Sequence, residues 1–110
     1  MTTGKRAPAH LAPATRAWWR AVCTGYELEA HHVRLLTLAA EAWDRCQQAR
    51  DIVASAGPVY TDRFGAPRAH PAVAIERDAR LSFARLLREL DLDVEPPPEG
   101  ARPPNLRRFT

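Results

Sequence analysis

The longest stretch without glycine or proline does most to limit what this chain can fold into. Residues 27–55 contain neither residue and are rich in Ala, Leu, Glu, Arg and Gln, which are strong helix formers. Gly57 and Pro58 follow closely, as is typical just beyond the end of a helix. We therefore predict one helix over residues 27–55, about 40 Å long at ~1.5 Å per residue. A helix of this length favours a mainly α fold.

One face of this predicted helix carries mostly small side chains at alternating spacings of three and four. Its members are His32, Leu35, Ala39, Ala42, Cys46, Ala49, Val53 and Ala56. Small side chains allow a second helix to approach closely. The pattern fits packing against another helix of the same chain, and it also fits a contact between subunits. The sequence leaves both interpretations open.

Two further helices are predicted on either side of the long one. A short helix over residues 14–24 carries Trp18 and Trp19 and ends at Gly25. We expect at least one of these tryptophans in the core, together with Trp43 of the long helix. After Pro71, apolar residues recur every three or four positions, which predicts a third, long helix. They are Ile75, Ala79, Phe83, Leu86 and Leu90.

The segment between the two long helices has a different character. Residues 57–71 combine the β-formers Val59 and Tyr60 with the turn residues Gly65 and Pro67. We predict a short β-hairpin or an extended loop that projects between the helices.

Prolines are concentrated at the two ends of the chain. We expect a flexible basic arm over residues 1–12, a helical domain for oligomerisation and DNA binding over residues 13–92, and an extended Pro-rich tail over residues 93–110. The tail ends in a cluster that resembles a docking peptide for a protein partner. The cluster consists of Leu106, Arg107, Arg108 and Phe109. An unstructured end without a role is the alternative.

The basic residues are almost all arginine: Lys5 is the only lysine among 16 Lys and Arg residues, and the net charge is +3. Arginine binds phosphate in a forked geometry, although a GC-rich genome also raises arginine content. Residues 1–26 contain four basic residues and no acid, and two more arginines lie in the predicted hairpin. The six candidate phosphate contacts are Lys5, Arg6, Arg16, Arg20, Arg63 and Arg68.

A second set of residues suggests contacts between subunits. Leu81 lies on the outer side of the third predicted helix, between Arg77 and Arg88, and an exposed leucine in such a place indicates an interface. We include Trp43 from the flank of the long helix in this candidate oligomer interface.

The sequence shows no combination of residues typical of catalysis or metal binding. Cys23 and Cys46 are far apart, and the neighbouring His31 and His32 point about 100° apart on a helix, so neither pair predicts a metal site. Glycine-rich phosphate loops and nucleophile motifs do not occur. We expect no enzyme activity and no cofactor. Since no apolar run approaches the roughly 20 residues of a membrane span, we expect no membrane partner.

The order of elements also resembles a known family, the small terminase subunits of tailed phages, specifically the P27-type group of HK97-like phages. The resemblance covers about residues 18–92. It is carried by Tyr26-Glu27-Leu28, Leu35-Leu36, Gly57, Tyr60, Gly65, His70-Pro71, Ile75, Ala79, Leu86-Leu87 and Leu90 to Leu92. It implies a non-enzymatic component of viral genome packaging that acts in the host cytoplasm.

The resemblance further implies a ring-forming homo-oligomer that binds double-stranded viral DNA and regulates the ATPase and nuclease of the large terminase subunit. Two other functions remain open at this point. A small helical DNA-binding transcriptional regulator would need a helix-turn-helix, which the spacing of the predicted helices does not show. A protein-interaction adaptor without DNA contact would use the same helical surfaces.

Overall fold

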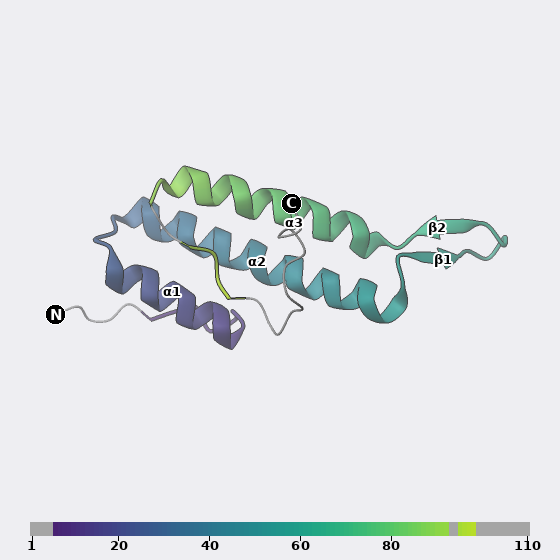
Figure 1. The fold of residues 1–110 in the computed structure, drawn as a ribbon, viewed down its shortest axis with the longest axis horizontal. Coiled ribbons are helices and arrows are strands. Elements are labelled where there is room, and N and C mark those ends of the chain that lie inside the picture. The colour runs from purple at the N-terminus through teal and green to yellow at the C-terminus, as the bar shows by residue number, and fades with distance from the viewer. Residues whose placement is uncertain (1–5, 93–94, 99–110) are drawn as a thin grey trace, which may run out of the picture.

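The structure is a computed structural model that describes residues 6–92 and 95–98. It contains three helices, with a β-hairpin between the second and the third (Figure 1). In chain order the elements are α1 Pro13–Gly25, α2 Ala30–Ala56, β1 Val59–Thr61, β2 Pro67–Ala69 and α3 Pro71–Leu90. The predicted mainly α fold, with a short hairpin between two long helices, is confirmed.

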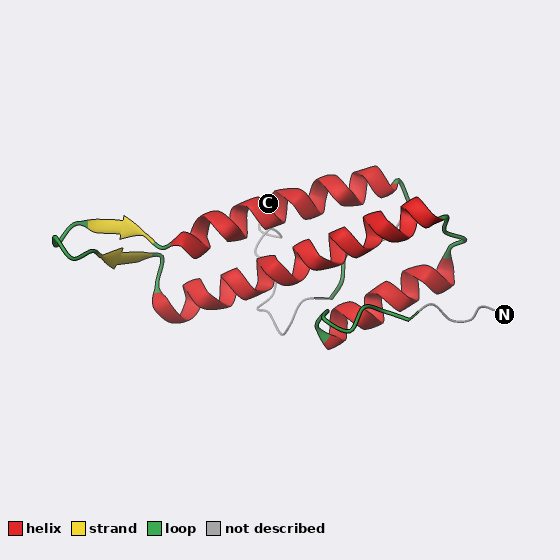
Figure 2. Cartoon of the chain, turned by 180° about the vertical axis from the view of Figure 1, so that it is seen from behind, coloured by secondary structure: helices red, strands yellow, loops and turns green. Residues whose placement is uncertain are grey.

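The molecule is elongated, with a longest extent of 60 Å. Helices α2 and α3 run side by side, and the hairpin continues past their ends (Figures 1 and 2). Helix α1 lies only along the half of this helix pair that is farther from the hairpin. We call residues 46–80 the arm, and the remainder of the described chain the body.

Helix α2 begins three residues later than predicted, at Ala30. The backbone of Glu29 is still extended, with φ −86° and ψ 172°. The ring Nδ1 of His32 accepts a hydrogen bond of 3.1 Å from the Glu29 N–H, so a side chain of the first turn satisfies the backbone just before the helix. At the other end Gly57 takes φ 87°, a conformation that favours glycine. Composition located the helix, but its first residue depends on this local bond.

Helix α3 begins where the sequence predicted, directly at Pro71. Proline suits the first turn of a helix because its missing N–H would have no partner there. The His70 side chain accepts a 3.0 Å bond through Nδ1 from the Ala72 N–H. This histidine therefore caps the first turn of the helix.

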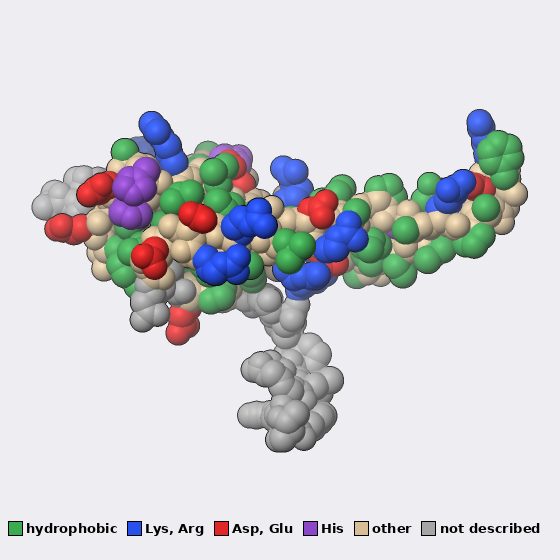
Figure 3. All heavy atoms as spheres, turned by 90° about the horizontal axis from the view of Figure 1, so that it is seen from above, with side chains coloured by type: hydrophobic (Ala, Val, Ile, Leu, Met, Phe, Trp, Pro, Cys, Tyr) green, Lys and Arg blue, Asp and Glu red, His purple; other side chains and the backbone are tan. Residues whose placement is uncertain are grey.

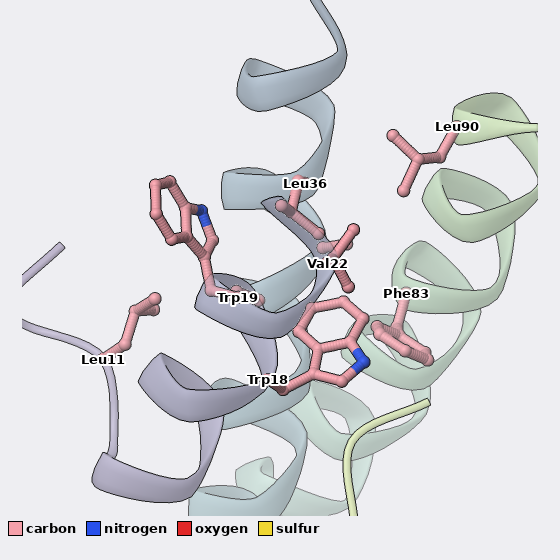
Figure 4. Packing of buried hydrophobic residues seen from close by; sticks show 9 residues of the cluster. Leu11, Trp18, Trp19, Val22, Leu36, Phe83 and Leu90 are labelled. Carbon is pink, nitrogen blue, oxygen red and sulfur yellow. The ribbon is translucent and has the colours of Figure 1, made fainter. Parts of the chain in front are cut away.

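The core of the body is aromatic and lies where α1 meets the helix pair (Figure 4). Trp18 and Trp19 are 8% and 3% exposed, which confirms the expectation that at least one of them belongs to the core. Trp43 is half-buried, with its ring centroid 5.1 Å from that of Phe83. The ring centroid of Trp18 lies 6.3 Å from that of Phe83. Three elements thus meet at one phenylalanine.

The arm has a different core, made of small side chains. The arm residues buried to below one tenth exposure are Cys46, Ala49, Ala72 and Ala79. An ion pair also joins the two helices there, since Arg50 Nε lies 3.2 Å from Glu76 Oε2. Ala49 and Cys46 belong to the small-residue face of α2 and are buried within the single chain, as the intramolecular interpretation predicts, whereas Ala56 at the end of that face is exposed.

Residues 6–12 are the described part of the N-terminal segment that the sequence predicts to be flexible over residues 1–12, and in this part the chain packs against the body. Leu11 is 2% exposed and belongs to the core cluster. Asp44 of α2 accepts a 2.7 Å bond from the Ala12 N–H through Oδ2 and a 2.6 Å bond from the Thr15 hydroxyl through Oδ1. One carboxylate therefore secures both the approach to α1 and its first turn. In the described part of this segment, the folded chain begins before Pro13.

The described part of the tail also returns to the body. Glu95 offers its carbonyl oxygen to the indole N–H of Trp18 at 2.7 Å, and Pro97 is buried. A proline-rich segment cannot join a regular element, but a single side-chain donor can hold its backbone. Residues 95–98 therefore follow the body instead of extending away from it.

Candidate nucleic-acid interface

The predicted phosphate contacts fall into two groups that the structure keeps apart. Arg63 and Arg68 lie on the hairpin at the outer end of the arm. Arg16 and Arg20 lie on α1 in the body, and Arg6 lies in the segment that precedes it. Lys5 is outside the described residues. Since α1 occupies the half of the molecule away from the hairpin (Figure 1), one subunit does not form a single basic patch from these side chains.

The tip of the hairpin is built around Asp62. Its Oδ1 accepts hydrogen bonds from the backbone N–H groups of Phe64 and Ala66, at 2.8 and 3.0 Å. Its Oδ2 accepts a third from Arg68 Nε at 3.0 Å. Gly65 supplies the φ of 82° that the turn requires. A carboxylate that bridges the turn and the opposite strand makes the tip a well-defined structure.

These contacts lower the pKa of Asp62 below its ordinary value of 3.8. The largest cause is the hydrogen bond from the Ala66 N–H, followed by the bond from Arg68 and then the one from Phe64. All three donors favour the charged carboxylate. Asp62 is therefore ionised at neutral pH and offsets part of the positive charge of Arg68.

The surface of the tip combines positive charge with a large apolar side chain. Phe64 is 79% exposed, and the Arg63 guanidinium carbon lies 5.0 Å from the centroid of its ring. The Arg68 side chain is 62% exposed, whereas the Asp62 side chain is only 16% exposed. Figure 3 shows the resulting pattern at the outer end of the arm, where blue side chains flank green ones. An approaching phosphate would meet the two arginines before the carboxylate.

The arginines of the body differ in how strongly they are bound to the protein. Arg16 is half-buried, and its Nη1 donates to the carbonyl oxygens of Leu11 at 2.6 Å and Ala9 at 3.3 Å. It therefore has a structural role in holding the segment before α1. Arg20 and Arg6 are exposed. Of the three, Arg20 and Arg6 are the more suitable partners for an external phosphate.

A comparison with known protein families shows which family the chain belongs to. The family described as phage terminase, small subunit, matches residues 15–95. The chain belongs to this family. The match contains all but the first two residues of α1, together with α2, the hairpin and α3, and it implies a role in phage DNA packaging. No curated protein and no solved structure gives a significant match, and the assignment to the P27-type group stays a prediction.

In this terminase small subunit the predicted interface residues lie on α2 and α3. Leu81 is 59% exposed on α3, between the exposed Arg77 and Arg88. The nearest charged partner of Arg77 is its neighbour Asp78, with Nε 3.5 Å from Oδ1. Trp43 lies instead on α2 and contacts Phe83 of its own chain. The four residues are therefore not equivalent, and Leu81 is the one whose apolar surface is most available.

Sequence reasoning missed a groove between α2 and α3. This open groove has a volume of about 430 Å³, and its lining includes Leu38 and Ile75, which are 51% and 44% exposed. Glu41, Arg45 and Asp78 contribute its charged groups. Ile75 belongs to the periodic apolar set that predicts α3, but its side chain is nearly half exposed. The spacing of apolar residues therefore locates the buried face of α3 only approximately.

Two further features of the terminase small subunit were not anticipated. Phe64 was not singled out, although it is the most exposed large apolar side chain at the tip. The sequence did carry a signal for its position, because an aspartate followed three positions later by glycine, as in Asp62 and Gly65, is typical of a turn and places Phe64 within that turn. Along α3, Arg80 and Arg85 are exposed in addition to the predicted arginines, and Figure 3 shows blue side chains gathered over this helix.

Three other expectations concern the docking cluster, metal binding and membrane spans. The docking cluster Leu106, Arg107, Arg108 and Phe109 lies outside the described residues. Within the described ranges, no group of three or more His, Cys, Asp or Glu side chains is placed to hold a metal ion. Over those same ranges, no helix of the terminase small subunit is long and apolar enough to cross a membrane.

Proposed function

We propose that this chain assembles into a homo-oligomeric ring that binds double-stranded viral DNA and regulates the large terminase subunit, without catalysis of its own. The observation that carries the proposal is the hairpin tip, where Arg63 and Arg68 are held at the outer end of the arm. The family match supplies the packaging context. Viral DNA is packaged inside the infected cell, so the proposed place of action is the host cytoplasm.

Assembly makes a weakly basic subunit an effective DNA ligand. The net charge of one chain is only +3, and a few phosphate contacts give weak, salt-sensitive binding. A ring repeats the same contacts around one duplex, so that each further contact forms at a high effective concentration. We propose Arg63 and Arg68 as the main phosphate contacts, with Arg20, Arg6, Lys5 and Arg16 at the N-terminal end in a supporting role.

Contacts between subunits would use apolar surface that a single chain leaves exposed. We propose that Leu81, with Arg77, Arg88 and the exposed part of Trp43, contributes to this interface, together with Leu38 and Ile75 in the groove between α2 and α3. Large exposed apolar side chains on an ordered helical surface are typical of a protein interface. Native mass spectrometry at micromolar concentration tests assembly, and a monomer would contradict the proposal.

The DNA contacts can be tested by measuring affinity against salt concentration. Replacing Arg63 and Arg68 by Ala removes two guanidinium groups that do not stabilise the body. We expect weaker binding and a decrease of about 0.9 in the slope of log K against log salt for each phosphate contact that is lost. The control replaces Arg34, an exposed arginine of α2 outside the proposed contacts, by Ala and should leave the slope as it is. An unchanged slope in the hairpin variant would exclude these contacts.

The tail is proposed to dock on the large terminase subunit through Leu106, Arg107, Arg108 and Phe109. Deleting residues 99–110 removes this cluster and retains the segment held by Trp18. Stimulation of the large-subunit ATPase should fall while DNA binding by the truncated protein persists. Full stimulation by the truncated protein would contradict the docking role.

A further inference from the structure

The hairpin tip carries an apolar side chain that phosphate binding does not explain. Phe64 is 79% exposed, and the Arg63 guanidinium carbon lies 5.0 Å from the centroid of its ring. Exposing a phenylalanine to water is unfavourable relative to burying it. A contact with phosphates alone would be served equally well by a small or polar residue at this position.

The turn holds Phe64 in a defined place. Its own backbone N–H is bound by Asp62 Oδ1 at 2.8 Å, and the same oxygen binds the Ala66 N–H at 3.0 Å. Two backbone bonds close the turn as well, from Asp62 N–H to Ala66 O at 2.9 Å and from Gly65 N–H to Asp62 O at 3.0 Å. The backbone of such a turn is already ordered before binding, so less conformational freedom is lost when the apolar side chain of Phe64 makes a contact.

The position of the tip also decides which partners Phe64 can reach. The hairpin prolongs the α2–α3 pair and points away from the body (Figures 1 and 2). The phenyl ring of Phe64 therefore cannot fold back into the groove between α2 and α3 of its own chain. A two-stranded ribbon is narrow, with strands about 4.8 Å apart, which allows its end to enter a groove of duplex DNA. The positive charge beside the ring favours a polyanion as the partner.

We infer that Phe64 is a wedge that inserts between base pairs of duplex DNA while Arg63 and Arg68 bind the flanking phosphates. Apolar wedges of this kind enter from the minor groove, partly unstack one base step and bend the duplex. The inference rests on the proposed DNA-binding function and specifies how the hairpin engages the DNA. It distinguishes Phe64, which contributes by stacking, from the two arginines, which contribute by charge.

The two contributions separate in a salt titration of DNA binding. Phe64→Ala should lower the affinity by at least about fivefold, because base–aromatic stacking is worth about 1–3 kcal/mol per base. The slope of log K against log salt should not change, because no charge is removed. Phe64→Leu keeps an apolar wedge and should recover most of the affinity. Val59→Ala, which shortens another exposed side chain of the hairpin (55% exposed), is the matched control and should bind like the unmodified protein.

Insertion itself can be observed with a duplex that carries 2-aminopurine and a dye pair at its ends. The unmodified protein should raise the 2-aminopurine fluorescence and bring the dyes closer together, and Phe64→Ala should do neither. If Phe64→Ala bound DNA with the same affinity and the same rise in fluorescence as the unmodified protein, the wedge would be overturned. A reduced slope in the Arg63 and Arg68 variant would then leave the proposed function intact. Smaller assemblies of Phe64→Ala by native mass spectrometry would overturn it too, because Phe64 would then bind another protein chain.

Discussion

The body and the arm are built from the same two helices, yet they bury different kinds of side chain. In the body, large residues from three elements meet, and Leu36 and Leu90 are almost completely enclosed. In the arm, small residues such as Ala49 and Ala72 are buried, while Ile52 and Ile75 remain nearly half exposed. Two helices enclose only the narrow line between them, and a third is needed to cover large side chains. Helix α1 therefore determines where this chain has a conventional core.

The strongest test of the comparison makes one substitution in each region. Phe83→Ala removes the ring shared by Trp18 and Trp43, and should lower the free energy of unfolding by about 3–5 kcal/mol. Phe64→Ala removes the same side chain from the tip of the arm and should change it by less than about 0.5 kcal/mol. Urea denaturation measures both. Equal losses would show that body and arm do not differ in the way described.

A second test loosens the contact that ties α1 to α2. Asp44→Ala leaves the buried Thr15 hydroxyl and the Ala12 N–H without their acceptor, and a lost partner of this kind lowers the free energy of unfolding by about 1–3 kcal/mol. Hydrogen exchange should rise in residues 6–16 and remain unchanged in the arm. Asp51→Ala, at an exposed position of α2, is the control. Uniform exchange through the whole molecule would mean that the two regions unfold together.

The smallest effect is expected from protonation of Asp62 in the arm. Because the pKa of Asp62 is lowered in the folded hairpin, the folded state binds this proton less readily than the unfolded one. The contribution of Asp62 is thus present at neutral pH and is lost as the pH falls below 3.8 toward the lowered value. The amide signals of Phe64 and Ala66 should titrate in this range by NMR, and Asp62→Asn should abolish the transition. A midpoint above 3.8 would contradict the hydrogen-bonded turn.

The elements that sequence predicted well are those bounded by punctuating residues. Gly57, with its φ of 87°, and Pro71 act through their own backbone geometry, and Gly25 is the last residue of α1, so three of the helix boundaries could be read within a residue or two. The start of α2 was placed too early, because it depends on a bond between the His32 ring and the backbone of Glu29. Helix-forming composition alone does not reveal such a bond.

The parts that could not be predicted depend on contacts between distant segments. Leu11 lies among alanines and prolines with no periodicity, and only its position against the body shows it to be a core residue. The arginines of the hairpin were identified correctly as hairpin residues, but the exposure of Phe64 beside them follows from the turn of Asp62. Arg16 was expected to be available and instead holds the carbonyl oxygens of the preceding segment. Residue type suggested the chemistry, and geometry assigned each residue to a structural or a surface role.

The hydrogen bond from Trp18 to Glu95 has a consequence for how the body opens. It joins residues 77 positions apart, so closing this loop loses considerable chain entropy unless the helices have already brought the two segments together. The bond is therefore among the last to form and the first to break. Since Trp18 is also a fluorophore, its emission should change when residues 95–98 leave the body, before α1 itself separates. The chain thus carries its own optical reporter of the earliest step in the release of its C-terminal segment.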